Sequence, residues 1–159
     1  MCGIVAFNGS KNAEERIIQG LEKLEYRGYD SAGIAVIDDG ELRVTKAAGR
    51  LDALVEKLEK DPLKGNVGIG HTRWATHGVP TESNAHPHVS SDGKIAVVHN
   101  GIIENFQSLK DDLIKKGFTF YSETDTEVVA NLIASKFDGD LKSAVEEAIK
   151  EVTGTFSLA

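Results

Sequence analysis

The segment MCGIVAFNGS, residues 1–10, opens the chain and directs its interpretation. It holds the single cysteine of the 159 residues, Cys2, followed by a short apolar run that predicts a buried strand. A free cysteine is most often a small buried hydrophobe. If Met1 is removed, however, Cys2 gains a free α-amine, and a thiol and an amine on one residue supply a nucleophile and a base together. The rest of the chain has to decide between these interpretations.

Length and composition predict one soluble globular domain. The chain is 40% hydrophobic and 27% charged, with 25 acidic against 18 basic residues. The charges are dispersed, so we expect no nucleic-acid-binding face. We also expect no membrane span and no secretory signal, since no apolar run reaches about 18 residues. One cysteine excludes an intramolecular disulfide, which favours the reducing cytoplasm.

The spacing of apolar residues predicts strands and helices that do not alternate strictly. Strands are expected at residues 2–8, 33–38, 41–47, 66–73, 94–101 and 154–159, and helices at 12–27, 51–58, 104–117, 122–137 and 140–152. This order favours an α+β fold in which helices cover mixed or antiparallel sheets. The chain stops inside an expected strand, whereas domain boundaries normally fall in exposed polar segments, so we expect a domain incomplete at its C-terminal end.

Three local signals refine this assignment. Asp39-Gly40 between apolar runs predicts a hairpin. Asn100-Gly101 is typical of a turn and is expected to stop the strand before it. Thr124 followed by Glu127 predicts a capping box at the start of a helix.

Residues that folding alone does not explain gather at strand ends, near the ends of two predicted helices and in the loop at residues 74–88. They are Arg27, Arg73, Trp74, Thr76, His77, His86, His88, His99, Asn100, Gly101 and Asp125. Function concentrates in loops held by a rigid scaffold. Each residue also has a structural interpretation: Asp125 suits a helix N-terminus, Arg27 can pair with Glu22 or Asp30, and Trp74 can belong to the core.

Cofactor sites have weak support. His86 and His88 can be imagined as metal ligands, but no matching cysteine or acidic pair lies near them, and we expect no metal. The glycine-bearing stretches at residues 26–33 and 65–73 match neither the Walker pattern nor the dinucleotide fingerprint. We therefore expect no cofactor.

Six segments resemble one known family in their order along the chain. They are MCGI, LEYRGYDSAG, GHTRWATHG, NAHPH, HNGIIEN and SETDTE. They are similar to the glutaminase domains, of the glutamine amidotransferase type 2 class, of isomerising glucosamine-6-phosphate synthases, which are glutamine:fructose-6-phosphate amidotransferases. Amidophosphoribosyltransferases share the MCGI start and the Asn-Gly pair, but HTRWATHG and NAHPH resemble the glucosamine branch more closely. The resemblance implies an N-terminal-nucleophile hydrolase fold, an αββα four-layer sandwich, over residues 1–159.

The resemblance implies that Cys2 hydrolyses L-glutamine to glutamate and ammonia. Ordinary thiols have a pKa of about 8.5 and α-amines about 7.7–8.0, so the amine of Cys2 can accept the thiol proton near neutral pH. The developing oxyanion is then expected to bind the Asn100 side-chain NH2 and the Gly101 N–H.

The resemblance also implies a binding site for the amino-acid end of glutamine. Arg73 supplies a bidentate donor for the α-carboxylate, and Asp125 supplies a carboxylate for the α-ammonium. Thr76 and His77 add hydrogen bonds. Three further residues complete the expected site: His86 lies near the pocket, Trp74 belongs to a shielding loop, and Arg27 orients the catalytic end.

In the full enzymes of this family, ammonia passes to a sugar isomerase domain that binds fructose 6-phosphate, and the enzyme is expected to be a homodimer. We expect residues 1–159 not to include such a domain. If Met1 is retained, the base is lost and we expect an inactive protein. Without further strands, we expect marginal stability or self-association. The alternative functions are a catalytically inert fragment, an interaction module that keeps the fold, or the glutaminase domain of another amidotransferase such as an amidophosphoribosyltransferase.

Overall fold

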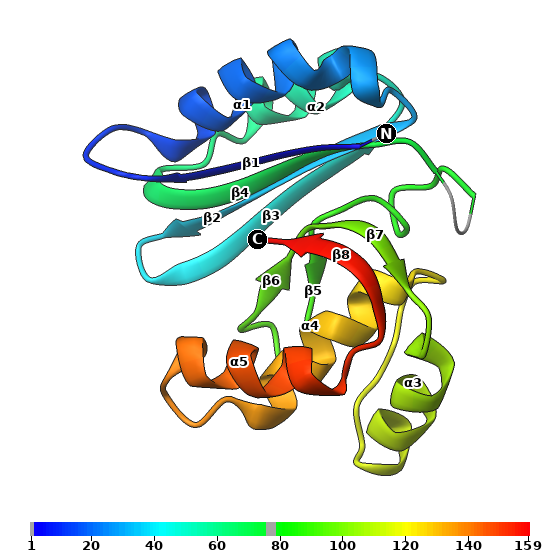
Figure 1. Ribbon diagram of the computed structural model, residues 1–159. Coiled ribbons are helices and arrows are strands. Elements are labelled where there is room, and N and C mark those ends of the chain that lie inside the picture. Colours follow the sequence, from blue (N-terminus) through cyan, green and yellow to red (C-terminus); the bar gives the residue numbers. More distant parts are fainter. Residues whose placement is uncertain (1, 76–78) are drawn as a thin grey trace.

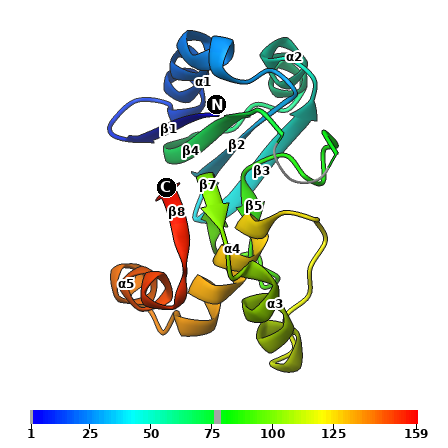
Figure 2. The ribbon, with the colours of Figure 1, turned by 45° about the vertical axis from the view of Figure 1, so that its right-hand side comes forward.

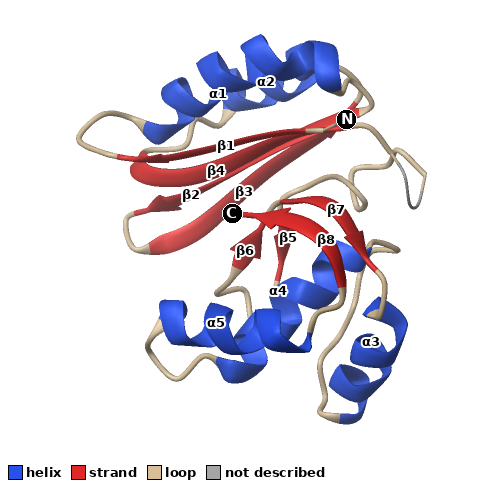
Figure 3. Ribbon diagram, in the orientation of Figure 1, coloured by secondary structure: helices blue, strands red, loops and turns tan. Residues whose placement is uncertain are grey.

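A computed structural model describes residues 2–75 and 79–159. Its elements form four layers, with helices on the two outside faces and strands between them (Figures 1 and 3). Figure 2 shows the same arrangement after rotation, with α1 and α2 on one side of the strands and α3, α4 and α5 on the other. The predicted αββα sandwich is confirmed. Among the described residues, no helix is both long and apolar enough to cross a membrane.

The first sheet is antiparallel throughout and has the order β1-β4-β2-β3. Its strands are β1 (Gly3–Asn8), β2 (Ser31–Asp38), β3 (Glu41–Ala48) and β4 (Gly65–Arg73). Helices α1 (Ala13–Leu24) and α2 (Leu51–Lys60) cover its outer face, and the short 3-10 helix η1 (Glu25–Arg27) follows α1. Ile17, Leu21 and Leu54 are fully buried between these helices and the sheet, which explains the apolar stripe of each helix.

The second layer consists of β5 (His88–Val89), β6 (Ala96–Val97), β7 (His99–Ile103) and β8 (Gly154–Leu158). Strand β7 pairs antiparallel with β8, which follows much later in the chain, and β5 pairs with β6. Helices α3 (Phe106–Lys115), α4 (Asp125–Lys136) and α5 (Leu141–Glu151) pack beneath these strands. Val128, Val129 and Leu132 of α4 are buried in this second core.

Most predicted elements are confirmed, but two local predictions are wrong. The hairpin at Asp39-Gly40 forms, with φ of 50° and 81° at its two residues. Asn100-Gly101 does not end its strand: β7 continues to Ile103 because β8 supplies the pairing partners. The capping box does not form either, since the Thr124 side chain makes no cap hydrogen bond and Glu127 binds other backbone groups. The short strand β5 begins within the segment expected to be a loop.

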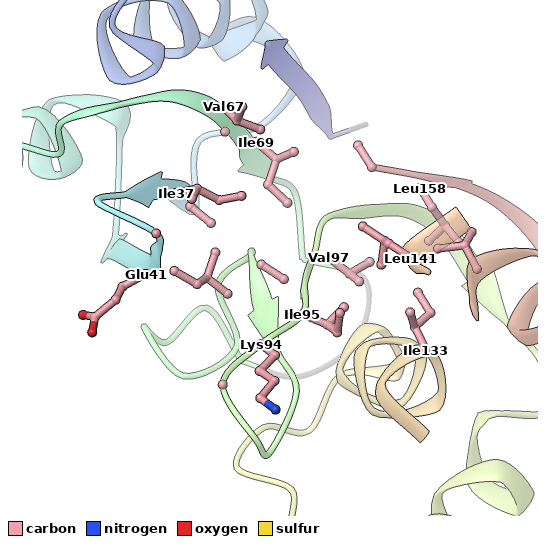
Figure 4. A pocket seen from close by; sticks show the side chains of 18 residues that line it. Ile37, Glu41, Val67, Ile69, Lys94, Ile95, Val97, Ile133, Leu141 and Leu158 are labelled. Atoms are coloured by element: carbon pink, nitrogen blue, oxygen red, sulfur yellow. The ribbon is translucent and has the colours of Figure 1, made fainter. Parts of the chain in front are cut away.

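An apolar groove of about 720 Å³ opens between the first sheet and the second layer. Ile37 and Ile69 line it from the first sheet, Val97 from β6, and Ile133 and Leu141 from the helices below (Figure 4). It shares no residue with the candidate site described next. The expected self-association is not tested by the structure of a single chain and stays a prediction.

Candidate active site

A second pocket, of about 430 Å³, lies where the start of β1 and the end of β4 meet β7. Every predicted site residue that the structure describes lines it: Cys2, Arg27, Arg73, Trp74, His86, Asn100, Gly101 and Asp125. Residues from separate parts of the sequence therefore converge on one cavity. The predicted roles of Thr76 and His77 fall on residues outside those that the structure describes.

Cys2 lines this pocket and has hydrogen-bonding partners on two sides. The backbone N–H of Trp74 lies 3.1 Å from Cys2 Sγ, so it can donate to the sulfur. The side-chain Nδ2 of Asn100 donates to the Cys2 carbonyl oxygen over 3.1 Å. A backbone donor directed at a sulfur stabilises the thiolate, which is the nucleophilic form. Sequence reasoning had assigned Trp74 through its side chain and missed this backbone contact.

The Trp74 side chain does not belong to the core. It is 47% exposed and contacts Tyr29 edge to face, with 5.3 Å between the ring centroids. The alternative interpretation of Trp74 as a core residue is therefore wrong. Asp30 secures the same segment, because its backbone N–H donates to Arg73 O at 3.2 Å and its carboxylate accepts a hydrogen bond from Ala75 N. Sequence reasoning considered Asp30 only as a partner for Arg27.

Asn100 and Gly101 lie in β7, beside Cys2. Gly101 has φ of +126°, and a Cβ placed there would lie 2.0 Å from the carbonyl oxygen of Thr155 in β8. Both facts require glycine. The neighbouring Asn100 side chain has two partners, since its Oδ1 lies 2.9 Å from His71 Nε2 while its Nδ2 faces Cys2. The Asn-Gly pair thus places an amide NH2 beside the thiol residue.

The pocket carries two buried groups of opposite charge. Arg73, at the end of β4, is 4% exposed, and Asp125, the first residue of α4, is 7% exposed. Asp125 Oδ2 accepts a hydrogen bond from Ile103 N at 2.9 Å, and its Oδ1 lies 3.9 Å from His99 Nδ1. Buried ions in one cavity favour a ligand that brings the complementary charges. A carboxylate and an ammonium on one small molecule meet that requirement.

Four buried histidines form a cluster at the site, and two of them, His86 and His99, line its pocket. The rings of His71 and His86 are 4.1 Å apart, and those of His86 and His88 are 4.8 Å apart. His86 Nδ1 lies 3.4 Å from the His99 backbone N–H, which can donate to it.

Burial is the largest influence on these histidines. It lowers the pKa of His71 to about 4, against opposing contributions from Asn100 and the His99 backbone. It lowers the pKa of His86 and of His88 well below the ordinary value, and nearby positive charges act in the same direction. Burial also lowers the pKa of His99, while Asp125 opposes the shift. The cluster is therefore neutral at pH 7.

No arrangement suited to a metal ion occurs in this cluster. Within residues 2–75 and 79–159, no three His, Cys, Asp or Glu side chains are grouped as metal ligands. His86 Nε2 and His88 Nε2 instead lie within hydrogen-bonding distance of the hydroxyls of Thr126 and Thr124. Sequence reasoning missed His71, although its place two residues before Arg73 in an expected strand could have suggested an inward side chain.

Comparisons with known proteins cover nearly the whole chain. Residues 71–159 match a family model described as glutamine amidotransferase domain. The isomerising glutamine–fructose-6-phosphate aminotransferase of Clostridium acetobutylicum is 55% identical over 158 residues, which are 99% of this chain and 26% of that protein. The enzyme of the same name from Thermus thermophilus is 54% identical over the same shares. The chain thus spans about a quarter of the length of these curated relatives.

Solved structures match at lower identity. The glutamine phosphoribosylpyrophosphate amidotransferase from B. subtilis, complexed with ADP and GMP, is 28% identical with a TM-score of 0.83, and the match covers 99% of this chain and 34% of that one. A structure described as the allosteric regulatory enzyme of purine biosynthesis has a TM-score of 0.86 at the same identity and coverage.

Proposed function

This chain belongs to the glutamine amidotransferase domain family, and from that premise we propose that it hydrolyses L-glutamine to L-glutamate and ammonia with Cys2 as the nucleophile. One observation carries the proposal: the thiol, a side-chain amide and two buried opposite charges line a single pocket. The thiol and the amide suit attack on a carboxamide. The charges of Arg73 and Asp125 suit the α-carboxylate and α-ammonium of an amino acid.

The chemistry requires that Met1 be removed, so that Cys2 has a free amine. This amine takes the thiol proton, directly or through a water, and the thiolate attacks the side-chain amide carbon of glutamine. Negative charge develops on the carbonyl oxygen, where Asn100 Nδ2 and the Gly101 N–H donate hydrogen bonds. The C–N bond then breaks, and the departing nitrogen takes the proton from the α-ammonium of Cys2 and leaves as ammonia.

The second half of the reaction releases glutamate. A water molecule attacks the thioester carbon, its proton is taken by the amine of Cys2, and the same two donors hold the second oxyanion. Breakage of the C–S bond returns the proton to the sulfur and restores the free thiol. The amine acts as base, then acid, in each half reaction, so no cofactor is needed.

The amino-acid end of the substrate accounts for the remaining site residues. The guanidinium of Arg73 holds the carboxylate, and Asp125 holds the ammonium. By family resemblance, Thr76 and His77 add hydrogen bonds, and Trp74 contributes to the loop that shields the site. His86 borders the pocket, and Arg27 orients its catalytic end. Amides without this amino-acid head would make neither of these two contacts and are therefore expected to be poor substrates.

For the longer protein, we propose that residues 1–159 form a glutamine amidotransferase type 2 domain that supplies ammonia to a sugar isomerase domain. That domain would convert fructose 6-phosphate to glucosamine 6-phosphate in a cytoplasmic homodimer. The 55% identity to an isomerising glutamine–fructose-6-phosphate aminotransferase supports this assignment over an amidophosphoribosyltransferase, since the corresponding structure is 28% identical. The second candidate function is a catalytically inert module that keeps the fold.

The test uses protein whose first residue is Cys2, verified by intact mass. We expect it to release glutamate from glutamine and to gain one adduct from 6-diazo-5-oxo-norleucine, a glutamine-like electrophile. Cys2→Ala is expected to lower turnover by at least about 1,000-fold, as for other lost nucleophiles. Protein that retains Met1 is expected to lose turnover as well.

The control is iodoacetamide, which alkylates accessible thiols without needing an amino-acid site. Alkylation by iodoacetamide together with no reaction toward the glutamine analogue, and no glutamate release, would favour the inert module. Undiminished turnover in the Cys2→Ala variant or in Met1-retaining protein would rule out the proposed mechanism.

A further inference from the structure

The side-chain amide of Asn100 lies between two partners, one that contacts its oxygen and one that contacts its nitrogen. Its Oδ1 is 2.9 Å from His71 Nε2, and its Nδ2 is 3.1 Å from the carbonyl oxygen of Cys2. An amide oxygen only accepts hydrogen bonds, so His71 Nε2 must donate. The two contacts therefore specify both the orientation of the Asn100 amide and the ring nitrogen of His71 that carries the proton.

We propose that His71 is a positioning residue for the reaction proposed above: its Nε2–H holds the Asn100 amide so that the NH2 group, and not the oxygen, faces Cys2. The inference rests on the proposed glutaminase function. It assigns a task to a residue for which the sequence motifs and the family resemblance supply none here.

The orientation matters because an amide flip reverses the sign of the partial charge that Asn100 presents to the reacting carbon. Rotation of the terminal torsion of Asn100 by half a turn would exchange its oxygen and nitrogen, and this torsion has no strong preference of its own. The flipped oxygen would face the Cys2 carbonyl and the developing oxyanion, which are both acceptors. A donor worth about a hundredfold in rate would become a repulsive dipole.

The position of His71 suits it for this task. It is fully buried in β4, where it pairs with Ile4 of β1 and Gly33 of β2, and its ring packs on that of His86. The ring is thus held in place and cannot follow a flipped amide. Its low pKa keeps it neutral at pH 7, with one ring proton to place.

The backbone of His99 is the competing acceptor for that proton. It acts to raise the pKa of His71, as a carbonyl near the ring would. Nevertheless, His71 Nδ1 is buried and makes no hydrogen bond of acceptable geometry within the described residues, whereas Nε2 lies 2.9 Å from Asn100. Placing the proton on Nε2 satisfies the buried donor, and placing it on Nδ1 leaves a buried N–H without a partner.

The first test measures the tautomer directly and needs no turnover. Nitrogen-15 NMR of the histidine rings at pH 7 distinguishes an Nε2–H ring from an Nδ1–H ring, and a His71→Gln spectrum assigns the His71 signals. We expect a neutral ring with the proton on Nε2. A proton on Nδ1 would overturn the inference, whatever the activity of the protein.

The second test separates the hydrogen bond from packing. His71→Phe keeps an aromatic ring but removes the donor, and His71→Gln keeps an N–H donor. We expect His71→Phe to lower kcat for glutamine hydrolysis by about 100-fold with KM changed by less than about threefold, and His71→Gln to recover about tenfold of that loss. Asn100→Ala should lower kcat similarly, and His71→Phe should add little in the Asn100→Ala background.

His88→Phe is the matched control. It makes the same substitution in another buried ring of the cluster, and that ring contacts Thr124 and His86 rather than Asn100. We expect it to reduce stability about as much as His71→Phe while kcat stays within about threefold of the parent. Equal loss of kcat in His71→Phe, His71→Gln and His88→Phe would show a merely structural effect and overturn the inference. An inactive parent protein would instead contradict the proposed function. The tautomer would still show whether the Nε2–H of His71 orients the Asn100 amide.

Discussion

At the scale of single residues, Gly101 meets the strictest steric requirement in the site. Its φ of +126° is rare for residues with a side chain, and a Cβ would approach Thr155 O to 2.0 Å. The backbone N–H of the same residue is a proposed oxyanion donor. A change at Gly101 should therefore reduce stability and turnover together.

We expect Gly101→Ala to lower the free energy of unfolding by about 3 kcal/mol, because backbone strain and overpacking add at this position. Urea unfolding followed by circular dichroism measures the change. Gly93→Ala is the matched control, since Gly93 also has positive φ, of +76°, but open space around its Cβ position. We expect Gly93→Ala to lower the free energy of unfolding by about 1 kcal/mol. Equal losses in the two variants would contradict the close contact with Thr155.

At the scale of elements, the segment before α4 is held by the helix that follows it. The carboxylate of Glu127, 3% exposed, accepts hydrogen bonds from Tyr121 N at 2.8 Å and from Ser122 N at 2.7 Å. It also accepts one from the Ser122 hydroxyl at 2.6 Å. This carboxylate fixes the path by which the chain enters α4 and therefore the position of Asp125, the first residue of that helix.

We expect Glu127→Gln to raise KM for glutamine by about tenfold and to cost about 2 kcal/mol of stability, since the amide has one acceptor oxygen in place of two and brings a donor against backbone N–H groups. Steady-state kinetics and urea unfolding measure the two effects. Glu147→Gln on the exposed face of α5 is the control and should change neither by a measurable amount. An unchanged KM in Glu127→Gln would separate this carboxylate from the substrate site.

At the scale of the whole molecule, the histidine cluster joins the two inner layers. His71 belongs to the first sheet, His88 and His99 to the second layer, and His86 contacts the rings of His71 and His88. All four pKa values lie below the ordinary value, so the unfolded chain binds more protons than the folded protein as the pH falls below about 6.5. The stability that these neutral histidines contribute is therefore fully present above pH 6.5. It is lost progressively as the pH falls toward the folded pKa, which is about 4 for His71.

We expect the free energy of unfolding to fall between about pH 6.5 and pH 5, a window in which most carboxylates stay ionised. His71 alone contributes a loss of about 2 kcal/mol over this range, and the other three histidines act in the same direction. Urea unfolding across the window measures the slope, and His88→Phe should make it shallower. A flat profile would contradict the burial of neutral histidines between the layers.

Local sequence determined much of this architecture. The apolar spacing of α1 and α2, the hairpin at Asp39-Gly40 and the strand that becomes β4 follow from contacts within a few positions, which residue type and period express directly. The sequence also indicated the site motifs, because a leading cysteine, an arginine after a strand and an Asn-Gly pair are chemically distinctive. The structure brings these residues to one pocket, and the roles assigned to them stay predictions.

Tertiary structure decided what distant partners control. The Asn-Gly pair locally predicts a turn. In the structure it lies within β7, because β8, far along the chain, pairs with it. The position of Glu127 predicts a capping residue, yet its carboxylate accepts hydrogen bonds from the backbone of the preceding segment. The contact of His71 with Asn100 joins residues 29 positions apart, and only the meeting of β4 with β7 creates it. Residue types determined which chemistry the chain can carry, and the packing of its layers decided that the Trp74 N–H and the Asn100 NH2 group face Cys2.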